Sequence, residues 1–449
     1  MYKWLLALRY LTGRRISYVA VMVIGLCVFV VFVVMTVMDG LVGQFKQRTH
    51  DFVGDCVVST ESMVGFPYYD RFVTILHSEP IVEAASAVIN TYGLVALASR
   101  QDAVGLQIMG IEPTWHFKVT GLGKSLYLHP DDPNKAFLAQ HDPNLPGCIL
   151  GIDLVLNRDW SGSYDYRWLP VKAIYEISCF PLTAKGALAR VGAGYVNAKR
   201  FAFADVSRTG LAREDGGCVY LPFGQLQVLS GMAGPPGRAT AIHIRFRPNV
   251  DLMAGTAKVA ELWDQFRKAC QDLPQSQLLA GVKVKDWKTY RKATIAPMEK
   301  EQIAMVVMFV LLATTAIFIV FVVFYMIVAN KARDIGILKA VGASFGGVMG
   351  LMVGFASLIG LLGASIGLLA GWAFLSRINQ IEYLLFERFG FQLWDRTIFS
   401  IGQIPNQIHL DLAAAVALSA IIVCLTGCLP PAMKAARMQP SDTLRASPV

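Results

Sequence analysis

The chain has 449 residues, of which 54% are hydrophobic and only 16% are charged. Because soluble domains carry about a quarter charged residues, this composition argues against a soluble enzyme, a disordered protein and a collagen-like fibre. The net charge of +9 is compatible with binding to nucleic acid, with binding to acidic lipid, or with a charge bias that sets membrane topology. The positions of the charges decide among these three interpretations.

Four charge-free hydrophobic runs predict membrane-spanning helices at residues 16–38, 302–329, 345–376 and 412–433. About 20 residues of helix cross the hydrocarbon core of a bilayer, so each run is long enough to span it. The first run is longer than a signal-peptide core, and no small-residue cleavage site follows it before Asp39. We therefore expect it to remain as a span.

The positions of Lys and Arg predict the orientation. Residues 1–15, 330–344 and 434–449 carry nearly all of the net positive charge, and alternate crossing places these three segments on one side. That side is the cytoplasm, because Lys and Arg concentrate there. Residues 39–301 and 377–411 are then expected outside it. Because the outer side is nearly neutral, nucleic-acid binding loses its electrostatic support.

The insert at residues 39–301 predicts an α/β domain large enough to bury its own core. Its strand-like runs are Cys56–Thr60, Thr91–Ala98, Val104–Ile111, Val171–Ile177, Arg200–Ala204, Cys218–Leu221 and Ala241–Phe246. Its helix-like runs are Tyr69–His77, Leu150–Asn157, Phe223–Leu229 and Leu252–Lys268. The polar, proline-containing segment 131–147 predicts a boundary between two subdomains. The irregular stretch Phe180–Lys199 is either an ordinary loop or an arm for a partner.

Two short motifs mimic catalytic sites. Gly123-Lys124-Ser125 resembles the end of a phosphate-binding loop, but Lys118 stands where that motif needs glycine. The run Gly342–Gly346 matches a nucleophile elbow, but it joins a basic segment to a span rather than a strand to a helix. The histidines show no metal-ligand spacing. We therefore expect no catalytic residue and no metal site in this chain.

The spans themselves contain no charged residue, although ion-coupled transporters usually keep such residues along their pathway. Any transport is therefore expected to draw its energy from another subunit. Two glycine series in the third span predict close helix packing, although glycine is common in any membrane helix. The series are Gly346, Gly350 and Gly354, then Gly363, Gly367 and Gly371.

The segment 330–339 predicts a short amphipathic helix on the cytoplasmic side. Ile335 and Leu338 fall near one face, and Lys331, Arg333 and Lys339 surround them. Such a helix lies on anionic lipid or docks in a partner's groove. A solvated positive loop is the alternative, and composition does not decide between them.

Several of these residues resemble the FtsX/MacB/LolC–LolE permease superfamily. The run Met298–Glu301, an apolar span and then residues 331–344 resemble its signature, and residues 430–445 resemble its closing motif. The LolC/LolE branch is indicated by Arg9-Tyr10-Leu11 before Val37–Gly40, and by Trp287. Within the insert, residues 109–113 resemble the G-I-x-P element of the family, and Gly210–Leu221, with Glu214-Asp215, looks like its later core strand.

This resemblance implies four membrane helices with a MacB-like α/β periplasmic domain inserted between the first and second. It implies an inner-membrane permease subunit that hydrolyses no ATP itself and couples mechanically to a LolD-like ATPase, which binds ATP and Mg²⁺. A second LolC/LolE-type permease completes the complex. The cargo is a lipoprotein taken from the outer leaflet and passed to a LolA-like chaperone. A MacB-like exporter or an FtsX-like regulator of cell-wall hydrolases is the alternative.

The resemblance also implies three sets of site residues. Those expected to couple to the ATPase are Lys331, Arg333, Asp334, Ile335, Leu338 and Lys339. Those expected to line a lipid cavity are Phe32, Met35, Met38, Val306, Phe309 and Ala313. Those expected in a chaperone-docking arm are Phe180, Pro181, Leu182 and Arg190.

Overall fold

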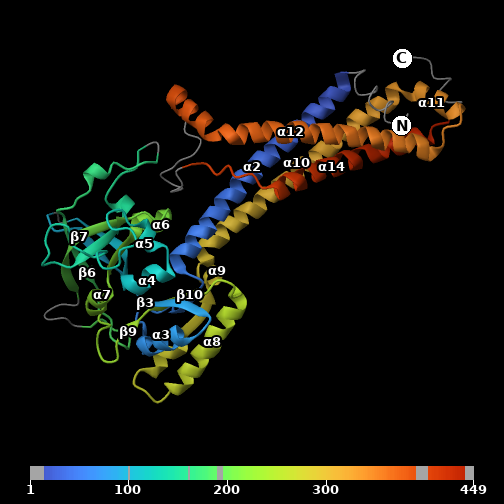
Figure 1. Cartoon of the computed structure of the whole chain (residues 1–449). Coiled ribbons are helices and arrows are strands. Elements are labelled where there is room, and N and C mark those ends of the chain that lie inside the picture. Colours follow the sequence, from blue (N-terminus) through green and yellow to red (C-terminus); the bar gives the residue numbers. More distant parts are fainter. Residues whose placement is uncertain (1–14, 100–101, 160–161, 190–195, 391–402, 440–449) are drawn as a thin grey trace. The chain divides into compact units, whose positions relative to one another are not determined.

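The structure is a computed structural model that describes residues 15–99, 102–159, 162–189, 196–390 and 403–439 (Figure 1). The chain forms two compact units. The helical unit comprises Met1–Gly43, Pro297–Trp394 and Gln403–Val449, and the α/β domain comprises Gln44–Ala296 with Asp395–Gly402. The predicted fold class is confirmed, because a large α/β domain is inserted between the first and second of four long apolar helices.

Among the described residues, four helices are long and apolar enough to cross a membrane: α2 (Arg15–Val53), α10 (Lys292–Asn330), α12 (Phe345–Phe389) and α14 (Leu410–Arg437). A short helix, α11 (Ala332–Ala340), lies between α10 and α12 in the sequence. Helix α12 continues to Phe389, so the start of the loop predicted at 377–411 is helical. It ends at Gly390, whose φ of 64° is the left-handed conformation that glycine accepts most easily.

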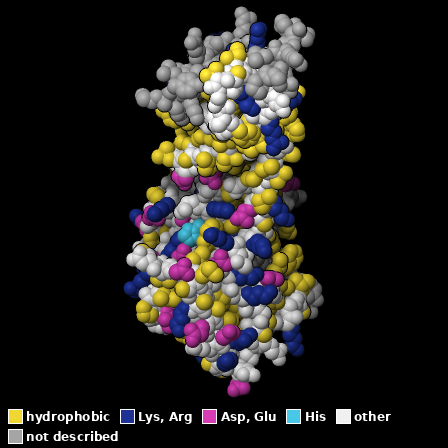
Figure 2. Space-filling view, turned by 90° about the vertical axis from the view of Figure 1, so that its right-hand side faces the viewer, with side chains coloured by type: hydrophobic (Ala, Val, Ile, Leu, Met, Phe, Trp, Pro, Cys, Tyr) yellow, Lys and Arg dark blue, Asp and Glu magenta, His cyan; other side chains and the backbone are white. Residues whose placement is uncertain are grey.

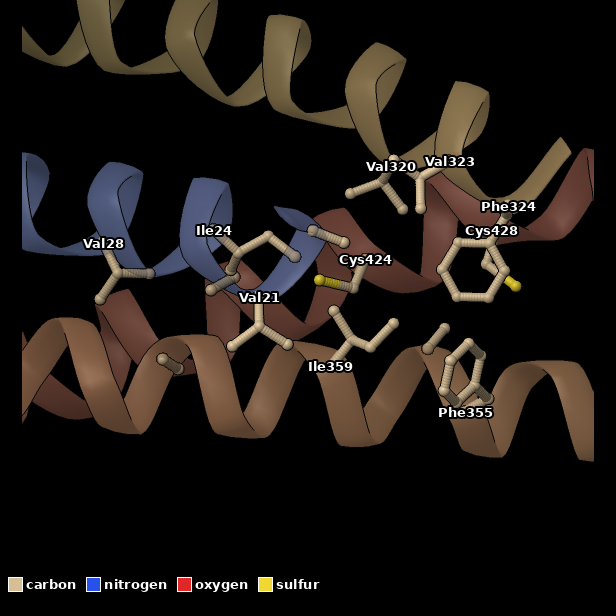
Figure 3. Packing of buried hydrophobic residues seen from close by; sticks show 14 of the residues in the cluster. Val21, Ile24, Val28, Val320, Val323, Phe324, Phe355, Ile359, Cys424 and Cys428 are labelled. Atoms are coloured by element: carbon tan, nitrogen blue, oxygen red, sulfur yellow. The ribbon is translucent and has the colours of Figure 1, made fainter. Parts of the chain in front are cut away.

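The four long helices share one apolar core (Figure 3). Each contributes buried side chains to it, including Ile24 of α2, Phe324 of α10, Phe355 of α12 and Cys424 of α14. Because lipid tails are as apolar as these side chains, close van der Waals packing rather than water exclusion holds such helices together. Accordingly, a Cβ on Gly427 of α14 would lie 2.8 Å from the carbonyl oxygen of Ile317 on α10.

The α/β domain is built on a nine-stranded sheet in the order β11-β1-β10-β3-β4-β8-β5-β7-β6. Its strands are β1 (Cys56–Thr60), β3 (Val82–Leu97), β4 (Ala103–Ile111), β5 (Gly147–Gly151), β6 (Ile174–Cys179), β7 (Asn197–Ser207), β8 (Cys218–Pro222), β10 (Ala241–Phe246) and β11 (Val282–Asp286). β2 (Phe66–Pro67) and β9 (Arg238–Ala239) form a separate pair. The domain's helices are α3 (Tyr69–Ser78), α4 (Pro113–Val119), α5 (Leu122–Ser125), α6 (Ala212–Gly217), α7 (Phe223–Leu229), α8 (Leu252–Ala269) and α9 (Trp287–Tyr290).

The long strand β3 divides this sheet into a closed and an open part. Its first half pairs with β10, and its second half, Gly93–Leu97, pairs with β6. The second pairing closes β3, β4, β8, β5, β7 and β6 into a ring. On the open part, Phe72 of α3 and Trp263 of α8 join the strands in a separate apolar core.

Three predictions for the domain are wrong. The segment 131–147 does not separate two subdomains, because strands before and after it belong to the same closed ring. The run Leu150–Asn157 is not a helix: Leu150 lies in β5, and only Ile152–Leu154 forms a 3₁₀ turn. A fully buried strand and a buried helix have the same apolar pattern over so few residues. Glu214-Asp215 lies in helix α6 rather than in a strand.

Candidate functional site

An apolar cavity lies among α2, α10 and α14. Its volume is about 300 Å³, and among the described residues its lining includes no charged side chain. It is lined by Ile24, Cys27, Val28, Val31, Met35, Val306, Phe309, Val310, Leu312, Ala313, Ala316, Leu412, Ala415, Val416, Ser419, Ala420 and Val423. The Ser419 hydroxyl donates to the carbonyl oxygen of Val416 at 2.8 Å within its own helix. The cavity therefore suits hydrocarbon, and it offers little to a polar headgroup.

Four of the six residues predicted for this cavity line it: Met35, Val306, Phe309 and Ala313. Met38 does not line it. Phe32 is only 1% exposed and packs on α12, where a Cβ on Gly371 would lie 2.7 Å from its ring. The contribution of α14 was missed, although its spacing of small side chains at Ala415 and Ser419 is a signal for a shared helix face.

The α10 wall of the cavity is partly open on the surface of the helical unit. Val306 is 43% exposed and Val310 is 59% exposed, although both line the cavity. In Figure 2, hydrophobic side chains cover much of the visible helical surface, whereas charged side chains are interspersed over the α/β domain. Such exposed apolar side chains on neighbouring turns of a helix are typical of contact with lipid or with a partner helix.

The glycine series of α12 divides into two halves. A Cβ on Gly363 would lie 2.7 Å from Ile24, and one on Gly367 would lie 2.5 Å from the carbonyl oxygen of Gly25, so this half of the series packs against α2. For Gly346, Gly350 and Gly354, no described atom lies within 4 Å of the added Cβ, so the packing predicted for them is not found within the chain.

Helix α11 presents a different face from the one predicted. Ile335 is only 2% exposed and belongs to the core of the helical unit. Lys339 donates to the carbonyl oxygens of Ala436 at 2.8 Å and Met438 at 2.7 Å, so it caps the end of α14. The exposed apolar residues are instead Ile337 at 49% and Val341 at 84%.

One charged side chain, that of Arg333, lies beside the exposed apolar residues of this segment. Arg333 is exposed one helical turn before Ile337. Lys331 pairs with Asp334 within the segment, and Leu338 is half-buried. We call Arg333, Ile337 and Val341, the residue directly after α11, the outer face of α11. Of the predicted coupling residues, Arg333 lies on it, whereas Ile335 and Lys339 serve the packing of the chain itself.

The segment after β6 forms a short hairpin. Thr183 and Ala187 are hydrogen-bonded across its tip, while Pro181 is buried at its base. The Leu182 amide donates to Ser230 and its carbonyl accepts from Arg238 at 2.8 Å, which anchors the base. Phe180 is 46% exposed. Arg190, predicted for the same arm, lies outside the described residues.

Within the α/β domain, the segment 209–215, which runs into helix α6, binds both chain segments that continue into the spans. Arg48 of α2 donates to the Gly210 carbonyl oxygen at 2.9 Å, and Glu214 pairs with Arg291 at 3.0 Å, just before α10. Asp215 accepts hydrogen bonds from the Thr209 and Gly210 amides, although burial raises its pKa. This cluster could not be predicted from the sequence, because nothing local indicates that Arg48 and Arg291 meet the same segment.

Known proteins resemble the chain along nearly its whole length. Residues 306–440 match the family model described as FtsX-like permease C-terminal. The lipoprotein-releasing system transmembrane protein LolC of Xylella fastidiosa (strain 9a5c) is 24% identical over 453 residues, covering 98% of both chains. LolC of Neisseria meningitidis serogroup B (strain MC58) is 27% identical over 177 residues, 38% of this chain and 41% of that protein. The predicted resemblance is confirmed: the chain is similar to LolC over nearly its whole length, and residues 306–440 match the FtsX-like permease model.

Two solved structures also match parts of the chain. The periplasmic region of MacB from Actinobacillus actinomycetemcomitans is 11% identical with a TM-score of 0.29, covering 55% of this chain and 95% of that one. A domain of a putative permease protein from Porphyromonas gingivalis is 15% identical with a TM-score of 0.29, covering 53% of this chain and 90% of that one.

Proposed function

We propose that this LolC-like ABC permease extracts lipoproteins from the outer leaflet of the inner membrane and passes them to a periplasmic chaperone. The observation that carries the proposal is the apolar cavity among α2, α10 and α14, which a saturated acyl chain matches in chemistry. Its relatives named as lipoprotein-releasing proteins support the choice of cargo.

The energetics explain why such a permease needs both an ATPase and an acceptor. An acyl chain that moves from lipid into an apolar cavity exchanges one hydrocarbon environment for another, so this step is nearly neutral. Exposing the chain to water costs about 0.8 kcal/mol per methylene. Release of the lipoprotein therefore requires energy from ATP and an acceptor that shields its acyl chain from water. We propose that a LolD-like partner binds ATP and Mg²⁺, and that this chain performs no hydrolysis.

We propose that the outer face of α11 contacts this ATPase. Exposed Ile337 and Val341, flanked by Arg333, offer the apolar and charged groups that a groove on a partner recognises. With α11 and both termini in the cytoplasm, the α/β domain lies in the periplasm. The exposed apolar surface of α10 would then face lipid or a second LolC/LolE-type permease, identical or not. The hairpin at Phe180–Leu182 would meet the chaperone.

Filling the cavity tests the cargo. Ala313→Trp places a bulky ring in the cavity, whereas Leu311→Trp adds the same ring at a position that is 62% exposed and outside the lining. With the ATPase and chaperone present in proteoliposomes, we expect A313W to lose lipoprotein transfer and keep ATP hydrolysis, and L311W to keep both. Equal transfer by the two variants would contradict the proposal.

Co-purification separates the remaining alternatives. An acylated protein retained with the complex in mild detergent supports lipoprotein release, whereas a small drug indicates a MacB-like exporter and a wall hydrolase indicates an FtsX-like regulator. A membrane receptor that senses a ligand through its α/β domain predicts no associated ATPase at all.

A further inference from the structure

One arginine of the α/β domain is buried next to the hairpin at residues 180–189. Arg238 of β9 is only 4% exposed, yet no carboxylate among the described residues pairs with it. Burial lowers the pKa of this side chain, because water no longer solvates the cation. A buried charge is costly unless other groups hydrogen-bond to it. The partners of Arg238 therefore indicate what this side chain holds in place.

These partners are carbonyl oxygens from three separate parts of the chain. Nη1 of Arg238 donates to Val64 at 2.8 Å, just before β2. Nη2 donates to Leu182 of the hairpin at 2.8 Å and to Gly231, which follows α7, at 2.7 Å. A guanidinium presents its donors in a rigid plane, so the three bonds fix these segments relative to one another.

Two of the three segments also support the hairpin directly. A Cβ on Gly231, whose φ is 72°, would lie 3.0 Å from the Pro181 side chain at the base of the hairpin. A Cβ on Gly186, at the tip, would lie 3.7 Å from the Val64 side chain. Arg238 therefore binds the hairpin together with both of its supports.

A hairpin of this length depends on such support. Its own backbone bonds include the one from the Ala189 amide to the Pro181 carbonyl oxygen at 2.8 Å, but a lone two-stranded hairpin is at best marginally stable in water. Phe180 is 46% exposed and Leu188 is 50% exposed. Held in place, the hairpin presents two apolar side chains that need no further ordering when a partner binds.

We infer that Arg238 is a positioning residue for chaperone docking, because it holds the hairpin in the pose that Phe180 and Leu188 need to meet the chaperone. The inference rests on the proposed function, which assigns the chaperone to this hairpin. Preorganisation of a binding segment raises affinity by removing the entropic cost of ordering it. Arg238 should therefore determine how much chaperone is needed, and it should not affect how fast ATP is hydrolysed.

The first measurement is amide hydrogen exchange of the full-length protein in nanodiscs, compared between residues 182–189 and strand β3. Arg238→Gln removes the forked donor, so we expect exchange in the hairpin to rise at least about tenfold and exchange in β3 to stay unchanged. Arg238→Lys keeps the charge but places all donors on one atom, so its hairpin should exchange at an intermediate rate. The matched control is Arg245→Gln. Arg245 also donates to a backbone carbonyl oxygen, that of Val119 at 3.0 Å, which belongs neither to the hairpin nor to its supports.

The second measurement is lipoprotein release from proteoliposomes that contain the ATPase, at increasing chaperone concentration. We expect R238Q to need about tenfold more chaperone for half-maximal release, with the maximal rate and ATP hydrolysis unchanged. R238K should need an intermediate amount, and R245Q should need as much as the wild type. A purely structural defect would instead lower the maximal rate.

If R238Q does not fold, R238K carries both measurements. The inference is overturned if the hairpin of the folded Arg238 variants exchanges as in the wild type, or if these variants need no more chaperone than R245Q. A wild type that releases no lipoprotein contradicts the proposed function instead, and hairpin exchange then decides alone whether Arg238 holds the hairpin.

Discussion

The ion pair between Glu214 of helix α6 and Arg291 allows a quantitative prediction about the segment 209–215. Its nitrogen and oxygen are 3.0 Å apart, and the side chains are only 10% and 15% exposed. Removing one partner of a buried pair typically costs 3–5 kcal/mol, because the other charge is left uncompensated. In this pair, removing Glu214 and removing Arg291 should cost different amounts of stability.

The difference lies in what surrounds the group that remains. In Glu214→Gln, the Arg291 guanidinium still lies over the Phe52 ring at 5.3 Å and near the Tyr290 ring at 5.9 Å, which stabilise a cation. In Arg291→Met, a buried carboxylate loses its cation. We therefore expect E214Q to lower the free energy of unfolding by about 2 kcal/mol and R291M by about 4 kcal/mol. The double variant should lose less than the sum.

The assay is reversible chemical denaturation of the full-length protein in detergent, arranged as a double-mutant cycle. Arg267 and Asp264 provide the control, because their pair is of similar length, 3.1 Å, but 44% and 60% exposed. Asp264→Asn should change stability by less than about 1 kcal/mol. A coupling energy between Glu214 and Arg291 no larger than that of this exposed pair would refute the argument.

Three further predictions concern the other elements. Gly367→Val should impair folding and membrane yield, because its Cβ would lie 2.5 Å from the Gly25 carbonyl oxygen, whereas Gly350→Val should be tolerated in the isolated chain because no described atom lies within 4 Å. Ile337→Asp should reduce ATPase co-purification without lowering the yield of the chain, whereas unchanged stoichiometry would contradict the role of α11. Burial lowers the pKa of His243 from its usual 6.5 to about 3, so the folded domain favours the neutral ring. His243 should therefore contribute its full stabilisation above pH 6.5 and lose it towards pH 3 by up to about 1.4 kcal/mol per pH unit. Burial also lowers the pKa of the neighbouring His116, so His243→Phe should reduce the slope of stability against pH, measured by pH-dependent unfolding, without abolishing it.

The membrane part could be predicted from the sequence because one physical requirement dominates it. Each span must hide its backbone polar groups in helical hydrogen bonds and present apolar side chains, and this produces long uncharged runs that are visible without any partner. The sequence does not predict which face of a helix packs against which neighbouring helix. The two glycine series of α12 have the same spacing, yet only Gly363, Gly367 and Gly371 meet α2. No feature of the local sequence distinguishes the series that packs against α2 from the series that does not.

Helix α11 illustrates the same limit on a smaller scale. Its nine residues carry apolar side chains on more than one face, and nothing distinguishes Ile335 and Leu338 from Ile337 in an isolated helix. Burial of Ile335 is decided by the core of the four long helices. Likewise, closure of the strand ring depends on β3 meeting β6, a long-range pairing that local strand patterns do not encode.

The chemistry of the apolar cavity has a consequence for selectivity under the proposed function. A phospholipid and a lipoprotein both present acyl chains. The described lining of the cavity has no charged side chain, so it interacts with the two kinds of acyl chain alike. Because specificity is a difference between affinities, uniform hydrocarbon contact cannot supply it. Discrimination must therefore come from groups that meet the polar part of the cargo. Charged side chains are spread over the α/β domain (Figure 2). Under the proposed function, substitutions there should therefore change which cargo is released, whereas substitutions in the cavity should change how efficiently any acylated cargo is released.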